Sequence, residues 1–314
     1  MTRTVEWIEV STLASGQVLR LPIYEVRGEG ERPVLGVSAA IHGDEIVGIE
    51  VIRRFLAYLE TTPFRGVARC LPVANPLAVE ALSRGTPLAV EVGNLNRVFP
   101  GDAAGDLVGR LAHLLVQQFL RPLTHLIDLH AGGTHPIVDY TISLRDLEMA
   151  LAFGQRVVRP VDGYGGTLGA VAAAEGKAAV VAEIGGGYVL DPLYVEVGLR
   201  GVVNVMRHLG MVDGRPERPA EQWIVPTVVA LRPQHGGLLY AEVTPEQMGA
   251  VVERGRVLGR VRSPYTFEVL EELRAPFARN VLLLLRPGLT RVNPGDYAFM
   301  VGDLEGAEVV RNRD

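Results

Sequence analysis

The chain has 314 residues, of which 48% are hydrophobic and 21% charged, and its formal net charge is −5. This composition is typical of a folded globular protein, and the mixed, slightly acidic charge excludes the basic footprint of a nucleic-acid binder. No apolar stretch reaches the roughly 18 residues of a membrane span, and the N-terminus lacks a signal-peptide core. Because Cys70 is the single cysteine, no internal disulfide can form. We therefore expect a cytoplasmic protein with neither a nucleic-acid nor a membrane partner.

The first two thirds of the chain are predicted to alternate between strands and helices. Residues 34–41 form an apolar run typical of a buried strand, and residues 46–60 carry apolar side chains at helical spacing. By the same criteria the sequence predicts further strands at 68–73, 124–129 and 178–182, and further helices at 77–82, 107–120 and 192–209. Strands that alternate with helices indicate an α/β domain with a largely parallel sheet.

The pattern changes near residues 215–219 (Arg-Pro-Glu-Arg-Pro), which are typical of a linker. Residues 226–314 then show short apolar runs separated by glycine and proline turns, as expected for a small all-β domain. Two domains are therefore predicted, at 1–225 and 226–314. The glycine-punctuated run at 255–261 resembles the barrel-sandwich folds of biotinyl and lipoyl carriers.

A carrier domain attaches its cofactor to a lysine, and Lys177 is the only lysine of the chain. It precedes the predicted C-terminal domain, so a swinging-arm role is excluded. We expect this domain to be a cap that shapes the entrance of a cleft, or a contact in a homo-oligomer.

Chemically useful side chains follow three of the predicted strands, namely His42, His130 and Glu183. The carboxyl ends of neighbouring parallel strands share one edge of a sheet, where ligands bind, so these residues could converge. Zinc in hydrolases is usually held by three His, Glu or Asp side chains, with the fourth position left to water. His42 and Glu45 have ligand spacing, and His130 is the best third candidate.

Two carboxylates support this interpretation. Asp128 lies two residues before His130, hence on the same face of the strand, where it could orient the imidazole. Glu183 ends a buried run, and a glutamate there needs a partner or a function. On spacing alone, a His-x-x-Glu pair is more often a solvated turn than a metal site.

Five motifs in a fixed order make the pattern more specific: His42–Glu45, Asn75–Arg84, Asn94–Gly101, Asp128–His130 and Ala182–Gly185. Together they resemble the succinylglutamate desuccinylase and aspartoacylase family, which shares its fold with the zinc carboxypeptidases. The resemblance spans residues 34 to about 210. The form of Gly93–Gly101, the glycines at 185–187 and the β-rich C-terminus look most like bacterial members of the N-acetyl-diaminobutyrate deacetylase type.

The resemblance implies a zinc-carboxypeptidase-like mixed sheet flanked by helices, with a small C-terminal all-β, barrel-sandwich-like domain. It also implies one zinc ion per chain and a role for each matching residue: His42, Glu45 and His130 as zinc ligands, Glu183 as the general base that becomes the general acid, Arg84 at the oxyanion, and Asn96 and Arg97 at a substrate carboxylate. These roles agree with the chemistry of zinc, which lowers the pKa of its bound water from about 15.7 to near 7 and so makes hydroxide available at neutral pH. Arg97 offers a carboxylate a planar fork, although a salt bridge elsewhere is its simplest alternative role.

The expected function is therefore that of a zinc-dependent amidohydrolase, in which a zinc-bound water attacks the amide of a small N-acyl amino acid or N-acyl amine. The residues with which aspartoacylases and desuccinylases recognise an acidic acyl group find no match, so the acyl group stays open. The oligomeric state stays open as well. Two alternatives are a zinc carboxypeptidase acting on short peptides and a non-catalytic binding protein on the same scaffold.

Three further features of the sequence suggest other roles. Gly36–Ala40 nearly spells a serine nucleophile elbow around Ser38, but its second glycine is alanine and Ser38 falls inside the apolar run. Gly163-Tyr164-Gly165 is followed by Leu168 where a dinucleotide fingerprint requires glycine. His135 follows the strand end at His130 and could line the cleft or simply belong to a loop.

Overall fold

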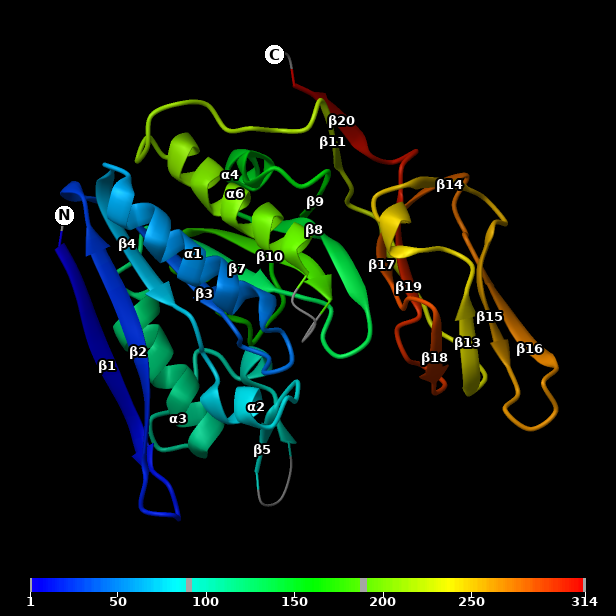
Figure 1. The fold of residues 1–314 in the computed structure, drawn as a ribbon, viewed down its shortest axis with the longest axis horizontal. Helices are drawn as coiled ribbons and strands as arrows, with labels where there is room; N and C mark the ends of the chain where they lie inside the picture. The colour runs from blue at the N-terminus through cyan, green and yellow to red at the C-terminus, as the bar shows by residue number, and fades with distance from the viewer. Residues whose placement is uncertain (1, 89–91, 187–190, 313–314) are drawn as a thin grey trace.

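The computed structural model describes residues 2–88, 92–186 and 191–312, so Gly187 of the glycine run at 185–187 lies outside the described residues. A long mixed sheet passes through the molecule (Figure 1). Its strands follow one another in the order β1 (Thr2–Thr12), β2 (Val18–Arg27), β4 (Arg65–Leu71), β3 (Glu29–Ala39), β7 (His125–His130), β10 (Ala178–Gly186), β8 (Ile137–Leu144), β17 (Arg279–Leu285), β19 (Phe299–Asp303) and β12 (Val228–Leu231).

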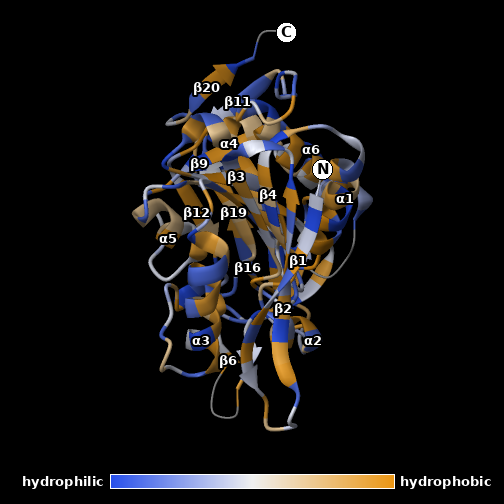
Figure 2. Cartoon of the chain, turned by 90° about the vertical axis from the view of Figure 1, so that its left-hand side faces the viewer, coloured by the Kyte–Doolittle hydropathy of each residue, from blue (hydrophilic) through white to orange (hydrophobic). Residues whose placement is uncertain are grey.

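The central strands β4, β3, β7 and β10 run parallel, whereas β2 and β8 pair antiparallel on either side. The predicted parallel arrangement thus holds at the centre, and the flanking strands make the sheet mixed, as the family resemblance implied. β3 is buried on both faces along its second half, which explains why its sequence there is a continuous apolar run and not an alternating one. Figure 2 shows hydrophobic residues concentrated on the central strands β3 and β4.

Helices cover both faces of the central strands and create two hydrophobic clusters. One face is covered by α1 (Val47–Thr61), α4 (Leu147–Phe153) and α6 (Pro192–His208). The other is covered by α3 (Leu107–Leu114), its π-helical continuation (Leu115–Leu120) and α5 (Leu168–Ala174). Phe55 on α1 and Phe119 on the π-helical turn are fully buried, and each such side chain contributes roughly 1.5–3 kcal/mol.

Local sequence explains where the helices start. Asp106, Asp146, Thr167 and Asp191 each accept a hydrogen bond from a backbone N–H of the first turn that follows, a cap of roughly 1 kcal/mol each. The predicted strands and helices of residues 34–209 are all present, with ends shifted by a few residues. The N-terminal hairpin β1–β2 and strand β8 have no counterpart among the predicted elements.

The C-terminal region is antiparallel β structure, as predicted (Figure 1). A second sheet contains β16 (Val269–Arg274), β15 (Val257–Arg262), β13 (Gly237–Ala241) and β18 (Leu289–Val292). It packs on β17 and β19 around a separate cluster that includes Leu239, Leu285 and Phe299. Because β17 also pairs with β8, the main sheet continues from the α/β part into the C-terminal strands.

The remaining elements are short. They are α2 (Pro76–Glu80), β5 (Thr86–Pro87), β6 (Val92–Gly93), β9 (Val157–Pro160), β11 (Glu221–Ile224), β14 (Val251–Glu253), β20 (Glu308–Arg311) and the 3-10 turns Leu95–Arg97 and Pro245–Gln247. β20 pairs with β11, which in turn pairs with β9. Within the described ranges, no helix is both long and apolar enough to cross a membrane.

Candidate metal centre and active site

The turn that carries His42 and Glu45 is held rigidly at the carboxyl end of β3. The Asn75 amide donates a hydrogen bond to the carbonyl of Ile41 (3.3 Å), and the N–H of Gly43 donates to the carbonyl of Ser83 (2.9 Å). A Cβ on Gly43 would lie 1.9 Å from the carbonyl carbon of Ala78, so only glycine permits this close approach to α2. The glycine between His42 and Glu45 is thus required by packing against α2.

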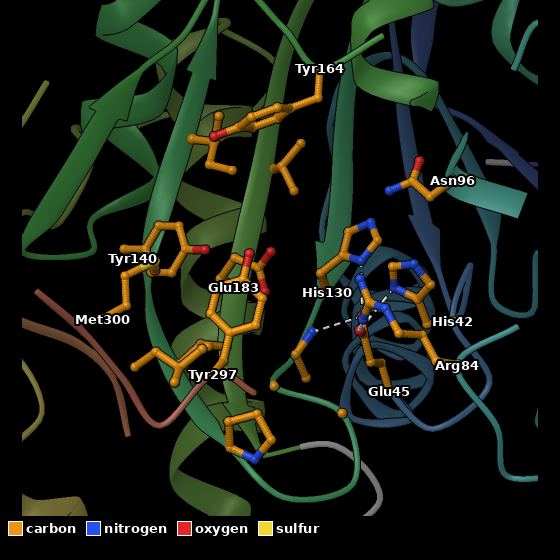
Figure 3. Close-up of a pocket in the computed structure, with 18 of the residues that line it drawn as sticks. His42, Glu45, Arg84, Asn96, His130, Tyr140, Tyr164, Glu183, Tyr297 and Met300 are labelled. Carbon is orange, nitrogen blue, oxygen red and sulfur yellow. Dashed lines mark hydrogen bonds and ion pairs between the residues drawn. The ribbon is translucent and has the colours of Figure 1, made fainter. Parts of the chain in front are cut away.

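His42, Glu45 and His130 converge on one point, as predicted from the strand ends (Figure 3). One potential ligand atom from each residue lies within 4.8 Å of the others, and all three side chains are buried. Nδ1 of His42 lies 2.9 Å from one carboxylate oxygen of Glu45, and Nδ1 of His130 lies 2.9 Å from the other. Two imidazoles and a carboxylate can hold a metal ion, and the same set of donors binds zinc in several known hydrolases.

The surroundings of the two histidines fit a metal. Nε2 of His130 lies 3.0 Å from Asp128, so Nδ1 is the nitrogen left to face Glu45. Ser38 on β3 donates a 2.7 Å hydrogen bond to the second oxygen of Asp128. Nε2 of His42 is buried and finds no hydrogen-bond partner among the described residues. A carboxylate that fixes one imidazole nitrogen while the other faces the centre is the usual support of a metal-binding histidine.

The residues of the cluster strongly shift one another's pKa values. Burial opposes ionisation of Glu45, but the neighbouring His42 and His130 hold its pKa well below the usual range. Burial likewise opposes charge on His130, yet Asp128 and Glu45 raise its pKa well above the usual value. Without a metal, the proton on His130 thus serves as a counter-charge of the carboxylates, and a divalent cation would replace it.

Glu183 lies beside this cluster. In the sheet register it is opposite His130 on β7 and opposite Tyr140 on β8, and in Figure 3 it lies between these two residues. Burial raises the pKa of Glu183 to about 7. A Gln155 side chain from the end of α4 donates to the Glu183 carbonyl (2.9 Å) and to Asp139 (2.7 Å), which holds this end of β10 in place.

We expect the raised pKa of Glu183 to make the metal-free protein less stable as pH rises. The unfolded chain ionises this carboxyl near pH 4.5 and the folded chain near 7, so the folded state holds the extra proton and stability falls between these values. The Glu183→Gln protein has no such carboxyl, so its free energy of unfolding serves as the reference. Compared with it, the free energy of unfolding of the wild type should fall by less than about 1 kcal/mol between low pH and pH 5, and by about 3 kcal/mol between low pH and pH 8. Urea unfolding of both proteins at the two pH values measures this, and an equal difference at both would contradict it.

The polar residues expected to contact substrate also face this region. Arg84 donates a 3.0 Å hydrogen bond to Glu45, and its side chain is 53% exposed, so further N–H groups remain available. Asn96 is buried, and its side-chain oxygen accepts a hydrogen bond from the backbone N–H of Leu168 at the start of α5 (3.1 Å). This bond turns the side-chain nitrogen of Asn96 toward the cavity (Figure 3). Arg97 is exposed and donates to the carbonyl of Asn96 (2.7 Å).

One cavity of about 680 Å³ joins all these residues. His135 lines this cavity, and so does every predicted site residue. The predicted residues are His42, Glu45, Arg84, Asn96, Arg97, Asp128, His130 and Glu183. The structure adds lining residues that the sequence did not reveal. Tyr140 and Arg159 come from β8 and β9, and Arg286, Tyr297 and Met300 come from the C-terminal region.

Two rival interpretations find no support at their residues. Ser38 is fully buried inside β3 and bonded to Asp128, so it is not exposed at a sharp turn as a nucleophile must be. Gly163-Tyr164-Gly165 lies in a loop before α5, and Tyr164 lines the cavity.

Asp44 has a structural role that the sequence did not indicate. It accepts hydrogen bonds from the N–H (2.9 Å) and the hydroxyl (3.0 Å) of Thr134, and so fixes the loop after His130.

Comparison with known proteins gives a consistent result. Residues 31–209 match the model of the succinylglutamate desuccinylase/aspartoacylase catalytic domain. The chain is 28% identical over 302 residues to the N-alpha-acetyl-L-2,4-diaminobutyric acid deacetylase of Halomonas elongata, covering 90% of this chain and 86% of that protein.

Two solved structures share the fold. A succinylglutamate desuccinylase/aspartoacylase from Rhodobacter sphaeroides superposes with a TM-score of 0.82 at 22% identity. The product-bound ectoine utilization protein EutE (DoeB) from Ruegeria pomeroyi superposes with a TM-score of 0.81 at 23% identity. Each alignment covers 96% of this chain and 95% of the other, so the likeness includes the C-terminal strands.

Proposed function

This chain belongs to the succinylglutamate desuccinylase/aspartoacylase family, and from that membership and the cavity we propose that it is a zinc-dependent deacylase. It would hydrolyse the amide bond of a small N-acyl amino acid or N-acyl amine. The observation that carries the proposal is the convergence of His42, Glu45 and His130 beside the half-buried Glu183. The Halomonas elongata relative, named as a deacetylase of an N-acetylated diamino acid, supports this substrate class.

The donor set fits one zinc ion per chain, held by His42, Glu45 and His130. When bound, zinc supplies a water of lowered pKa and polarises the carbonyl of the amide. Asp128 keeps His130 in the tautomer whose Nδ1 faces the site, because it engages Nε2.

Glu183 would handle the proton. Its carboxylate would accept a proton from the attacking water and pass it to the leaving nitrogen, since a group with a pKa near neutrality both accepts and returns a proton readily. Arg84 would donate to the developing negative oxygen. Such a donor contributes roughly 3–4 kcal/mol in a dry site, and we expect less from Arg84 because half of its side chain is exposed. Asn96 and Arg97 would bind the carboxylate of an N-acyl amino acid.

A hydrolysis screen tests the proposal. The zinc-loaded protein should release free amine from N-acyl amino acids or N-acyl diamines faster than from short peptides. A preference for peptides would instead support the zinc carboxypeptidase alternative, and no turnover of any amide would support a binding protein.

Arg97→Ala adds a matched arm to the screen. We expect it to raise KM for substrates that carry a carboxylate by about tenfold, the lower end of the range for charged hydrogen bonds because Arg97 is exposed. N-acyl amines without a carboxylate serve as the control and should be unaffected. Equal losses for both substrate types would remove Arg97 from carboxylate recognition.

A further inference from the structure

The C-terminal strands extend the floor of the cavity beyond Glu183. Tyr140 lies opposite Glu183, and Val138, two residues earlier on β8, lies opposite Leu284 on β17. Leu284 lies opposite Met300 on β19, which lies opposite Ala230 on β12. Directly opposed residues share one face of a sheet. The face that carries His130 and Glu183 therefore continues into residues 226–314.

This extension is non-polar. We call it the apolar wall, and it consists of Val138, Val228, Ala230, Leu284 and Met300, which all line the cavity. None of these side chains carries a charge or a strong hydrogen-bonding group. Val138, Leu284 and Met300 are anchored in the main hydrophobic cluster, with 2%, 8% and 7% of their surface exposed. Packing in this cluster holds the three side chains in place.

Arg286, which lines the cavity two residues after Leu284 of the wall, is already engaged. Nε of Arg286 donates to the carbonyl of Tyr297 (2.6 Å), and Nη1 donates to the carbonyl of Arg291 (3.3 Å). Nη2 lies 3.7 Å from Asp296. An acidic acyl group would have to compete with these partners for the guanidinium, so the wall favours a non-polar group over a carboxylate.

The direction of the substrate follows from the proposed function, on which this inference rests. In Figure 3, Met300 lies on the far side of Glu183 from His130, whereas Asn96 lies on the His130 side. The two halves of an amide leave the carbonyl carbon in different directions. With the amino-acid carboxylate at Asn96 and Arg97, the acyl chain extends past Glu183 toward the wall.

We propose that the apolar wall is an acyl-chain subsite, and that the preferred substrate is an N-acyl amino acid with a non-polar acyl chain longer than acetyl. An acetyl group is too short to cover a surface to which β8, β17, β19 and β12 all contribute. Each methylene buried on the wall contributes about 0.8 kcal/mol, so kcat/KM should rise about fourfold per added methylene until the wall is covered.

The test compares N-acetyl, N-butyryl, N-hexanoyl and N-succinyl derivatives of one amino acid with the zinc-loaded enzyme. Ala230→Phe places a large side chain on the wall outside the catalytic machinery. It should remove the preference for the longer chains, so that N-butyryl and N-hexanoyl derivatives are hydrolysed no faster than the N-acetyl derivative, and circular dichroism and zinc content matching the wild type show that the variant is folded. Val229→Phe is the matched control. Val229 directly precedes Ala230 on β12, so its side chain lies on the opposite face of the sheet, and it is 38% exposed.

Two outcomes overturn the subsite while leaving the proposed function standing. In the first, N-acetyl substrates are hydrolysed and the longer chains are no faster, or N-succinyl is faster than N-butyryl. In the second, Ala230→Phe changes the response to the amino-acid side chain and not to the acyl chain, which would place the amine half on the wall. If no N-acyl compound is hydrolysed at all, the proposed function fails, and the subsite fails with it.

Discussion

Glu183→Gln is expected to lower turnover by about 10²- to 10⁴-fold while the protein keeps its metal and its fold, because a neutral amide cannot accept or return the proton. Glutamine has the same shape, and Glu183 makes no ligand contact within the three-residue cluster, so zinc content should match that of the wild type. Initial rates and metal analysis on the same preparation measure both effects.

Glu175→Gln is a suitable control for that experiment. Glu175 is exposed and pairs with Lys177 outside the cavity (3.0 Å), so the same chemical change there should leave turnover unaltered. Wild-type rates in Glu183→Gln would remove this residue from the mechanism. Loss of zinc in that variant would mean that Glu183 supports the metal and does not serve proton transfer.

His130→Ala and Glu45→Ala are expected to lose bound zinc during purification and, with it, activity. Each removes one of three converging ligand atoms, and the loss of affinity should exceed the roughly 10- to 100-fold that removal of an outer supporting residue costs. Metal analysis after gel filtration should find about one zinc per chain in the wild type and traces in the variants.

The control for metal loss lies on the same strand. His125 begins β7, and its Nδ1 lies 2.8 Å from the Thr124 hydroxyl, away from the cluster. His125→Ala should retain zinc. Full zinc occupancy in both His130→Ala and Glu45→Ala would refute the ligand assignment, and circular dichroism would separate a ligand effect from unfolding.

The sequence predicted those parts of the site that sit at the ends of buried parallel strands. Such strands are apolar runs, so His42, His130 and Glu183 stood out as polar residues at their ends, and parallel pairing brings these ends together. The ordered motifs and the mixed α/β fold were likewise recognisable, because most of their residues lie in one continuous stretch of about 180 residues, 31–209.

The other half of the cavity was not predictable, for a physical reason. Tyr140 belongs to β8, whose apolar and polar residues alternate as in a half-buried strand. That pattern indicates a strand but not its neighbour, and only the register places Tyr140 opposite Glu183. Met300 and Arg286 are separated from Glu183 by more than a hundred residues of chain. They reach the cavity because β17 pairs with β8, and a pairing between distant segments leaves no mark in local sequence.

The same pairing means that the α/β part cannot be cut free without exposing a strand. Ending the chain at residue 225 would remove β17 and leave the backbone groups of Ile137 and Val138 on β8 unpaired on that side. Val138, now buried, would then meet solvent. A bare edge with apolar side chains is a template for intermolecular strand addition. We therefore expect a truncated α/β fragment to aggregate, so the half of the molecule that carries the metal cluster is best produced and studied as part of the whole chain.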